Sequence, residues 1–250
     1  MTLHRPSVKT KRLFVTIMID TVSASTTQQA VSDLPENNKH IAYLNSRRRR
    51  LMDIVGAVIG LTLGAPIMLI ASLVIKFVDR VPVIFTQERY GHHGKTFTIL
   101  KLRTLPVIET YRIIDDDNVD TERIQKKPQY VTTRTGAWLR RHSIDEMPQF
   151  WLVLKGEMSL IGHRPFPVYY VPHLKELDGI DAGYVDDYLR VIRQYRPGMT
   201  SLSSINGRSN LTMQQKMAYD MHYAESASLW GDCKILLRTL VVLITCEGAR

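Results

Sequence analysis

The sequence has 250 residues, of which 44% are hydrophobic and 23% are charged. This composition excludes a disordered or fibrous chain and is typical of a globular protein with a sizeable core. The formal net charge of +9 favours anionic partners, and lipid head groups, nucleotides and nucleic acid are all eligible. The only two cysteines, Cys233 and Cys246, support neither a disulfide framework nor a zinc cluster.

The first 45 residues are expected to form a mobile polar extension. Ser23–Asn45 is rich in Ser, Thr, Gln and Asn, which disfavours burial in a core. Before it, the basic start of the chain and the short apolar run Leu13–Ile19 superficially resemble a signal peptide. We do not adopt that interpretation, because the apolar run is minimal and Asp20 follows it at once.

Residues 46–80 are predicted to contain a membrane helix. The stretch Ile54–Ile75 has no charge and no side-chain amide. At ~1.5 Å per residue it is roughly 33 Å long, enough for a hydrocarbon core of about 30 Å. Pro66 lies just past its midpoint. Because proline lacks a backbone donor and disfavours helical dihedrals at the residue before it, Pro66 predicts a break or sharp kink.

Basic residues flank this helix on both sides, with Arg47–Arg50 before it and Lys76 and Arg80 after it. Arginine and lysine orient a spanning helix only when they are concentrated at one end. A re-entrant helix that bends at Pro66 and returns to the same face places both flanks in the cytoplasm. A single span with a tolerated proline is the alternative, and the residues alone leave both open.

Residues 81–250 are predicted to form a helix-rich α+β domain. Short strands are expected at Val83–Phe85, Thr96–Lys101 and Met158–Ile161, with an extended segment at Thr200–Ile205. Helices are expected at Thr135–Arg141, Ser143–Lys155, Asp181–Gln194, Thr212–Glu225 and Leu229–Thr245.

The helix predicted at Ser143–Lys155 carries adjacent carboxylates, Asp145 and Glu146. Ser143 and Glu146 have the spacing of a capping box, and a helix N-terminus stabilises anions. Both acids therefore have a purely structural interpretation. Against it stand arginines near predicted turns, which suit phosphate because the guanidinium group donates two parallel hydrogen bonds. These arginines are Arg140, Arg164, Arg196 and Arg208. A carboxylate pair beside bound phosphates usually also requires a divalent cation.

Two other functions are compatible with parts of the chain. The acidic run Asp115–Asp117 is a candidate metal site for a membrane-associated glycosyltransferase, although a solvated acidic loop is the simpler interpretation. A membrane-anchored basic adaptor without enzymatic activity would explain the positive charge, and it would tolerate Asp145→Asn.

The ordered series of motifs resembles the monotopic phosphoglycosyl transferases, also called polyprenyl-phosphate sugar-1-phosphate transferases, in their small form with a single catalytic domain. The resemblance covers roughly residues 48–242. It is carried by Lys101-Leu-Arg-Thr104, Ser143-Ile-Asp-Glu-Met-Pro-Gln149, Leu154–Gly162, Arg164-Pro165, Arg196-Pro-Gly-Met-Thr200, Asn206-Gly-Arg208 and Asp220-x-x-Tyr223. The chain departs from the usual pattern at His163, Ser201, Ser204 and Ser226.

The resemblance implies a monotopic protein on the cytoplasmic face of the bacterial inner membrane. Its parts would be the polar extension (1–45), one re-entrant helix kinked at Pro66 (46–80) and a small catalytic domain with amphipathic membrane-surface helices (81–250). Expected partners are a UDP-sugar, polyprenyl (undecaprenyl) phosphate and membrane lipids, with no nucleic acid, and a homodimer is left open.

The resemblance also assigns the chemistry. Asp145 is expected to attack the β-phosphate of the UDP-sugar, release UMP and carry the sugar phosphate to polyprenyl phosphate. Glu146 is expected to bind Mg²⁺, and the four arginines to bind phosphate. This reaction would begin the synthesis of an exopolysaccharide, capsule, O-antigen or glycoprotein glycan.

Overall fold

The computed structural model describes residues 39–107, 132–177 and 179–246, all within the second of two compact units, Asn37–Arg250. The acidic run Asp115–Asp117 lies outside these residues. The expected polar extension lies outside them too, except at its end. There Lys39–Leu44 forms helix α3, which packs against α11 (Met213–Ser226) and buries Leu44. Helical structure therefore begins before residue 46, where the sequence placed the boundary.

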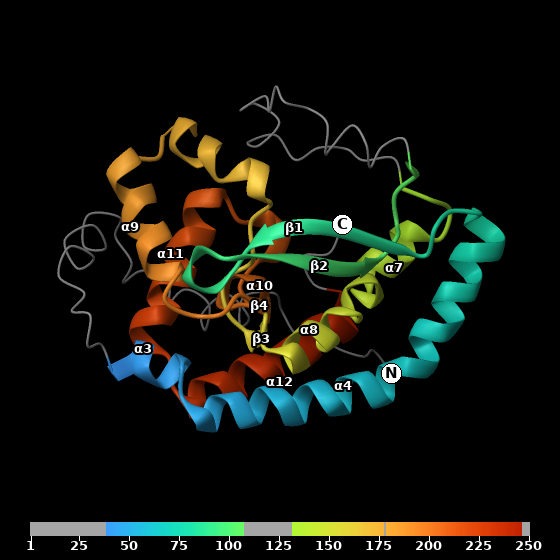
Figure 1. Cartoon of the computed structure of the whole chain (residues 1–250), viewed down its shortest axis with the longest axis horizontal. Helices are drawn as coiled ribbons and strands as arrows, with labels where there is room; N and C mark the ends of the chain where they lie inside the picture. Colours follow the sequence, from blue (N-terminus) through green and yellow to red (C-terminus); the bar gives the residue numbers. More distant parts are fainter. Residues whose placement is uncertain (1–38, 108–131, 178, 247–250) are drawn as a thin grey trace, which may run out of the picture. The chain divides into compact units, whose positions relative to one another are not determined.

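Helix α4 (Arg47–Val74) contains the apolar stretch and continues as a π-helical turn, Ile75–Asp79. The side chain of Ser46 caps it by accepting a hydrogen bond from Arg49 N at 3.3 Å. Pro66 lies inside α4, so of the predicted break or sharp kink the break is wrong. The ribbon instead changes direction in the middle part of the helix (Figure 1). A proline removes one backbone hydrogen bond, and a long helix accommodates that loss by bending.

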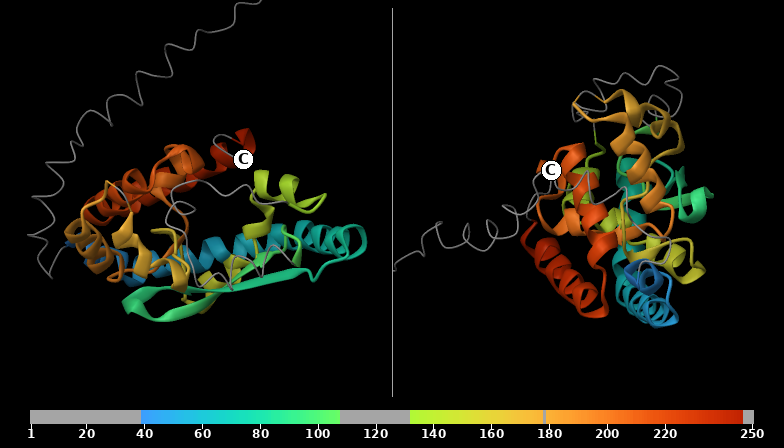
Figure 2. Two further views of the ribbon diagram at one scale, coloured as in Figure 1. Left: turned by 90° about the horizontal axis from the view of Figure 1, so that it is seen from above. Right: turned by 90° about the vertical axis from the view of Figure 1, so that its left-hand side faces the viewer.

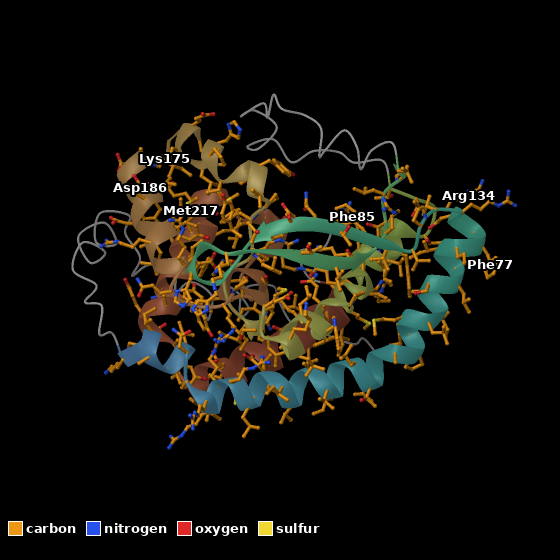
Figure 3. All side chains as sticks on the ribbon, in the orientation of Figure 1. Phe77, Phe85, Arg134, Lys175, Asp186 and Met217 are labelled. Atoms are coloured by element: carbon orange, nitrogen blue, oxygen red, sulfur yellow. The ribbon has the colours of Figure 1, made fainter. Side chains whose placement is uncertain are left out.

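One face of α4 packs against the rest of the unit and the opposite face is apolar and exposed. The packed face buries residues spaced about one or two turns apart, which are Arg49, Asp53, Ala57, Gly64 and Ala71. Gly60 permits close approach, because a Cβ there would lie 2.5 Å from the ring of Phe150 in α8 (Gln149–Lys155). Large side chains on the exposed face include Leu63, Leu69, Ile70 and Phe77, and Phe77 points away from the other elements (Figure 3).

Strands β1 (Ile84–Tyr90) and β2 (Thr96–Leu102) form an antiparallel hairpin. Ile84 pairs with Leu102 and Tyr90 with Thr96. The turn that connects them requires a left-handed backbone conformation, and His93, a non-glycine residue, adopts it with a φ of 56°. The two predicted strands are confirmed, and the first is longer than the sequence indicated.

Strands β3 (Ser159–Ile161) and β4 (Gly198–Thr200) form a short parallel pair in which Ser159 lies opposite Gly198. A Cβ at Gly198 would lie 2.0 Å from Gly162 N, so only glycine allows these backbones to meet. The prediction of an extended Thr200–Ile205 holds for Thr200 and Ser201 and is wrong from Leu202 on. Helix α10 (Leu202–Ile205) follows because the Ser201 side chain caps it, accepting a hydrogen bond from Ser204 N at 3.0 Å.

The other helices close the fold and largely follow the prediction. They are α7 (Gly136–Arg141), α9 (Ala182–Ile192), α11 and α12 (Leu229–Thr245). Short 3₁₀ turns occupy His92–Gly94, Ile144–Glu146, Val168–Tyr170, Pro172–Glu176 and Arg208–Asn210. Seen from above, the hairpin and the α11–α12 pair lie on opposite sides, with α4 running between them (Figure 2). The described part of the chain is thus helix-rich with two small sheets.

Both ends of α4 contact this same unit. At its start, the buried Arg49 pairs with Asp232 of α12 across 3.3 Å. At its end, an apolar cluster joins the helix to β2, α7 and the 3₁₀ turn at residues 144–146. The cluster consists of Ala71, Ile75, Leu102, Leu139 and Ile144. The far end of the apolar helix and the turn that carries the carboxylate pair therefore share one core.

Candidate active site

The carboxylate pair lies in a 3₁₀ turn, η3 (Ile144–Glu146), and not inside an α-helix. The capping box predicted for Ser143 and Glu146 is absent. Ser143 has a left-handed backbone with a φ of 56° and caps nothing, while its Oγ accepts a hydrogen bond from Arg208 Nη2 at 2.8 Å. Helix α8 begins only at Gln149. Contacts between distant parts of the chain therefore replace the expected local cap.

Asp145 is buried, with 6% of the residue exposed. Burial and the adjacent Glu146 raise the pKa of Asp145 to about 6, against the opposing effect of Lys101, Arg140 and Arg164. A carboxylate with this pKa is ionised at neutral pH yet is more basic than an ordinary aspartate. These are the properties of a carboxylate able to act as a nucleophile.

Glu146 has the opposite character. Its Oε1 lies 2.6 Å from Lys101 Nζ and 3.3 Å from Arg164 Nη2. Burial alone would raise the pKa of Glu146, but these two cations lower it well below the ordinary value. Glu146 is therefore firmly ionised. The pKa values of the two neighbouring carboxylates shift in opposite directions because only Glu146 has close cationic partners. Such a division commonly marks two carboxyl groups with different tasks.

Lys101 is a site residue to which the sequence gave no role. It lies near the end of β2, and burial lowers its pKa although Glu146 opposes that effect. The available signal was a lysine inside an otherwise apolar half-buried strand, since charged residues in such positions need a partner. The identity of that partner, 45 residues away, follows only from the fold.

A pocket opens beside Glu146 and combines charged and apolar walls. Its cations come from β1, β2 and the loop after β3, and its apolar residues come from β2, the same loop and β4. The lining residues are Arg89, Ile99, Lys101, Glu146, Gln149, Arg164, Pro165, Gly198 and Met199. Three cations against one carboxylate suit an anionic ligand.

Three of the four predicted phosphate-binding arginines lie around the η3 turn. Arg164 contacts Glu146 with its side chain 62% exposed, which leaves most of its donors available. Arg140 acts on the carboxylate of Asp145 electrostatically. Arg208 reaches the turn through Ser143. The structure thus gathers these three near the carboxylate pair.

Arg196 is directed elsewhere. Its Nε donates to the carbonyl of Gly156 at 2.8 Å, and the charges that influence it most are those of Arg50, Asp53 and Arg49. Arg196 therefore lies beside the start of α4. Its hydrogen bond to Gly156 connects the segment before β4 to the residue that follows α8.

The donor set fits a magnesium ion shared with substrate, not a site complete by itself. The described residues contain no cluster of three or more His, Cys, Asp or Glu side chains. Mg²⁺ commonly binds through one or two carboxylates together with substrate phosphates and water, and Glu146 with Asp145 offers that many. Both ion pairs of Glu146 use Oε1, so its other carboxylate oxygen would remain available to a cation.

Comparison with known proteins agrees with this arrangement. A sequence profile described as "Bacterial sugar transferase" matches residues 44–246. The UDP-glucose:undecaprenyl-phosphate glucose-1-phosphate transferase of Caulobacter vibrioides is 38% identical over 81% of this chain and 72% of its own length. The exopolysaccharide production protein ExoY of Rhizobium meliloti is 31% identical over 86% of this chain and 94% of its own.

A third relative is considerably longer than this chain. The UDP-glucose:undecaprenyl-phosphate glucose-1-phosphate transferase of Escherichia coli is 34% identical over 83% of this chain, which spans only 42% of that protein. The match is therefore to part of the longer enzyme. The profile covers both the apolar helix and the carboxylate pair, and it argues against the hypothesis of an adaptor without enzymatic activity. The chain belongs to the bacterial sugar transferase family and is a transferase.

Proposed function

We propose that the protein transfers a sugar-1-phosphate from a UDP-sugar to polyprenyl phosphate and releases UMP. The observation that carries this proposal is the buried carboxylate of Asp145, whose pKa is raised, directly beside Glu146 in the wall of a cation-lined pocket. Relatives named as UDP-glucose:undecaprenyl-phosphate glucose-1-phosphate transferases support the two substrates.

In the first step, a carboxylate oxygen of Asp145 attacks the β-phosphorus of the UDP-sugar. The bond between that phosphorus and the oxygen bridging to the α-phosphate breaks, and UMP leaves with the bridging oxygen and its electron pair. The sugar-1-phosphate is then bound to Asp145 as an acyl phosphate. Lys101 and Arg164 lie where they can offset the negative charge of the reacting phosphates, which is the main obstacle to attack by an anion.

In the second step, a phosphate oxygen of polyprenyl phosphate attacks the same phosphorus. The bond to Asp145 breaks, the carboxylate is regenerated, and the product is a polyprenyl diphosphate sugar. Dividing the transfer into two steps lets two polyanionic substrates use the pocket in turn.

Glu146, with the phosphates of the substrate, would hold Mg²⁺. When bound, this ion neutralises phosphate charge and orients the phosphates. The ion pairs of Lys101 and Arg164 with Glu146 keep this carboxylate ionised and fix its position before substrate binds.

We further propose that α4 is re-entrant and that the catalytic unit lies on the cytoplasmic face of the membrane. Two observations support this. Both ends of α4 contact one unit, through Arg49 at the start and Ile75 at the end, so a simple span would have to separate residues that pack together. The outward face is apolar, with Leu63 69% and Leu69 62% exposed, as expected for contact with lipid.

The reaction product would initiate the assembly of a lipid-linked glycan such as an exopolysaccharide. The decisive experiment supplies purified protein with Mg²⁺, polyprenyl phosphate and a panel of UDP-sugars, and identifies the released nucleotide. UMP is expected with at least one sugar. Release of UDP would instead indicate glycosyl transfer without the phosphate and would contradict the proposal.

A further inference from the structure

Gln149 is a buried amide whose nitrogen lacks a partner. It is the first residue of α8, its side chain is 3% exposed, and no described residue accepts a hydrogen bond from its Nε2. Buried polar groups are nearly always hydrogen-bonded, because an unmet donor loses its interactions with water without compensation. A residue that costs stability in this way needs an explanation, and a ligand that supplies the missing acceptor is one.

The position of Gln149 suggests which ligand. Its side chain lines the pocket that also contains Lys101, Glu146 and Arg164, three residues after Glu146 and four after Asp145. The terminal torsion of glutamine is broad, so the amide of this lining residue can turn its N–H group to a bound acceptor without a movement of α8. A group bound between the two cations would lie next to it.

We propose that Gln149 is a catalytic residue that donates a side-chain N–H to a non-bridging oxygen of the phosphoryl group transferred to and from Asp145. This inference rests on the proposed function. A phosphoryl oxygen fits because it only accepts hydrogen bonds, because the unmet atom is a donor, and because the neighbouring cations already favour phosphate. Charge on these oxygens must be stabilised in both transfer steps, so one donor acts in both.

The test uses Gln149→Met, which has a similar shape but no donor. If Gln149 serves the substrate, this variant has an unchanged or higher Tm, because it removes an unmet buried donor. Its kcat/KM for UMP release falls by about 100-fold, the effect of losing one oxyanion-stabilising donor. The loss has a similar size with every UDP-sugar of the panel that the wild-type protein accepts, and formation of the labelled enzyme adduct slows in parallel.

Tyr188→Phe is the matched control. The Tyr188 hydroxyl is fully buried and donates to Asp220 at 3.0 Å, so its removal should lower the Tm and leave kcat/KM unchanged. Three results for Gln149→Met would overturn the inference. These are activity within about threefold of the wild type, a lowered Tm that accounts for the loss of activity, or a loss confined to one sugar, which would indicate contact with a sugar hydroxyl. Failure of the wild-type protein to release UMP would instead refute the proposed function itself.

Discussion

Lys101 Nζ and Glu146 Oε1 lie 2.6 Å apart, and this ion pair fastens the β1–β2 hairpin to the turn that carries Asp145. Because Lys101 is committed to Glu146, the carboxylate of Asp145 receives cationic charge only at longer range. The hairpin thereby causes the pKa values of Asp145 and Glu146 to differ. This difference leads to a separate prediction for each residue.

Asp145→Asn should abolish both turnover and the covalent adduct. Asparagine has nearly the same shape but cannot form the acyl phosphate. Because burial raises the pKa of Asp145, the ionised form destabilises the fold at neutral pH, and the variant should have an equal or higher Tm. The measurement is radiolabel from a UDP-sugar retained on denatured protein when polyprenyl phosphate is withheld. Wild-type protein should retain the label, and a labelled Asp145→Asn protein would refute attack by this residue.

Glu146→Gln should raise the Mg²⁺ concentration needed for half-maximal activity and slow the first step, because the variant loses the charge assigned to cation binding. Titration of Mg²⁺ in a single-turnover assay measures both effects. An unchanged Mg²⁺ dependence would remove Glu146 from the proposed metal site.

The local sequence predicted elements whose determinants are local. Helix α11 has its capping box between Thr212 and Gln215, and α12 occupies the predicted residues Leu229–Thr245. The same reasoning failed at Ser143, because Arg208, 65 residues away, binds its hydroxyl. A short-range pattern cannot reveal a competing partner that only tertiary structure brings near.

The residues of the candidate site were likewise predictable only where a local pattern or the resemblance pointed to them. The sequence identified the carboxylate pair and the arginines through spacing and resemblance, and the structure gathers three of those arginines near the pair. The sequence assigned no role to Lys101 or Gln149, although both stand in motifs of the resemblance, since the position of each depends on how β2 and α8 meet. Arg196 shows the converse, because its place beside a turn suggested phosphate binding while the fold directs it to the carbonyl of Gly156.

Arg164→Lys and Arg208→Lys should each lower kcat/KM by about tenfold or more while leaving the Tm unchanged, since lysine keeps the charge but loses the planar pair of donors. Arg190→Lys is the control, because Arg190 forms an exposed ion pair with Asp187 at 2.7 Å on α9. Steady-state UMP release measures all three. Wild-type activity in the Arg164→Lys and Arg208→Lys proteins would show that these residues do not bind phosphate bidentately.

Asp220 should make the free energy of unfolding fall as the pH rises. Burial raises its pKa to about 8, whereas an unfolded aspartate titrates near 3.8. Between these pH values the folded protein holds a proton that the unfolded chain has lost. The contribution of Asp220 to the free energy of unfolding is therefore fully present below about pH 4 and declines by about 1.4 kcal/mol per pH unit until about pH 8. Asp220→Asn removes this titration. Urea denaturation at several pH values should show the variant gaining on wild type as the pH rises, and a constant difference would contradict the assignment.

Asp232→Asn should lower the free energy of unfolding by about 3–5 kcal/mol, because it leaves the buried Arg49 without its ionic partner. Both side chains are almost completely buried, and Asp232 also accepts hydrogen bonds from Tyr43 and Tyr223. The control is Glu157→Gln at the exposed Lys155 pair, which should change stability by at most about 1 kcal/mol. Denaturation in detergent measures both, and equal effects would show that the buried pair does not hold α4 in place.

The topology of α4 can be tested with single cysteines at Arg48 and Lys95, which lie on either side of the apolar stretch Ile54–Ile75 and are exposed, after Cys233 and Cys246 are replaced by serine. A re-entrant helix leaves both positions in the cytoplasm, so an impermeant thiol reagent added to intact spheroplasts should label neither, and permeabilisation should expose both. Labelling of only one position before permeabilisation would show that the helix spans the membrane. Pro66→Leu supplies the contrast, because it restores the missing backbone donor within a run already long enough to cross the bilayer. This variant should increase labelling of one end. It should also lose activity, because the spanning form separates the start of α4 from the core around Ile75.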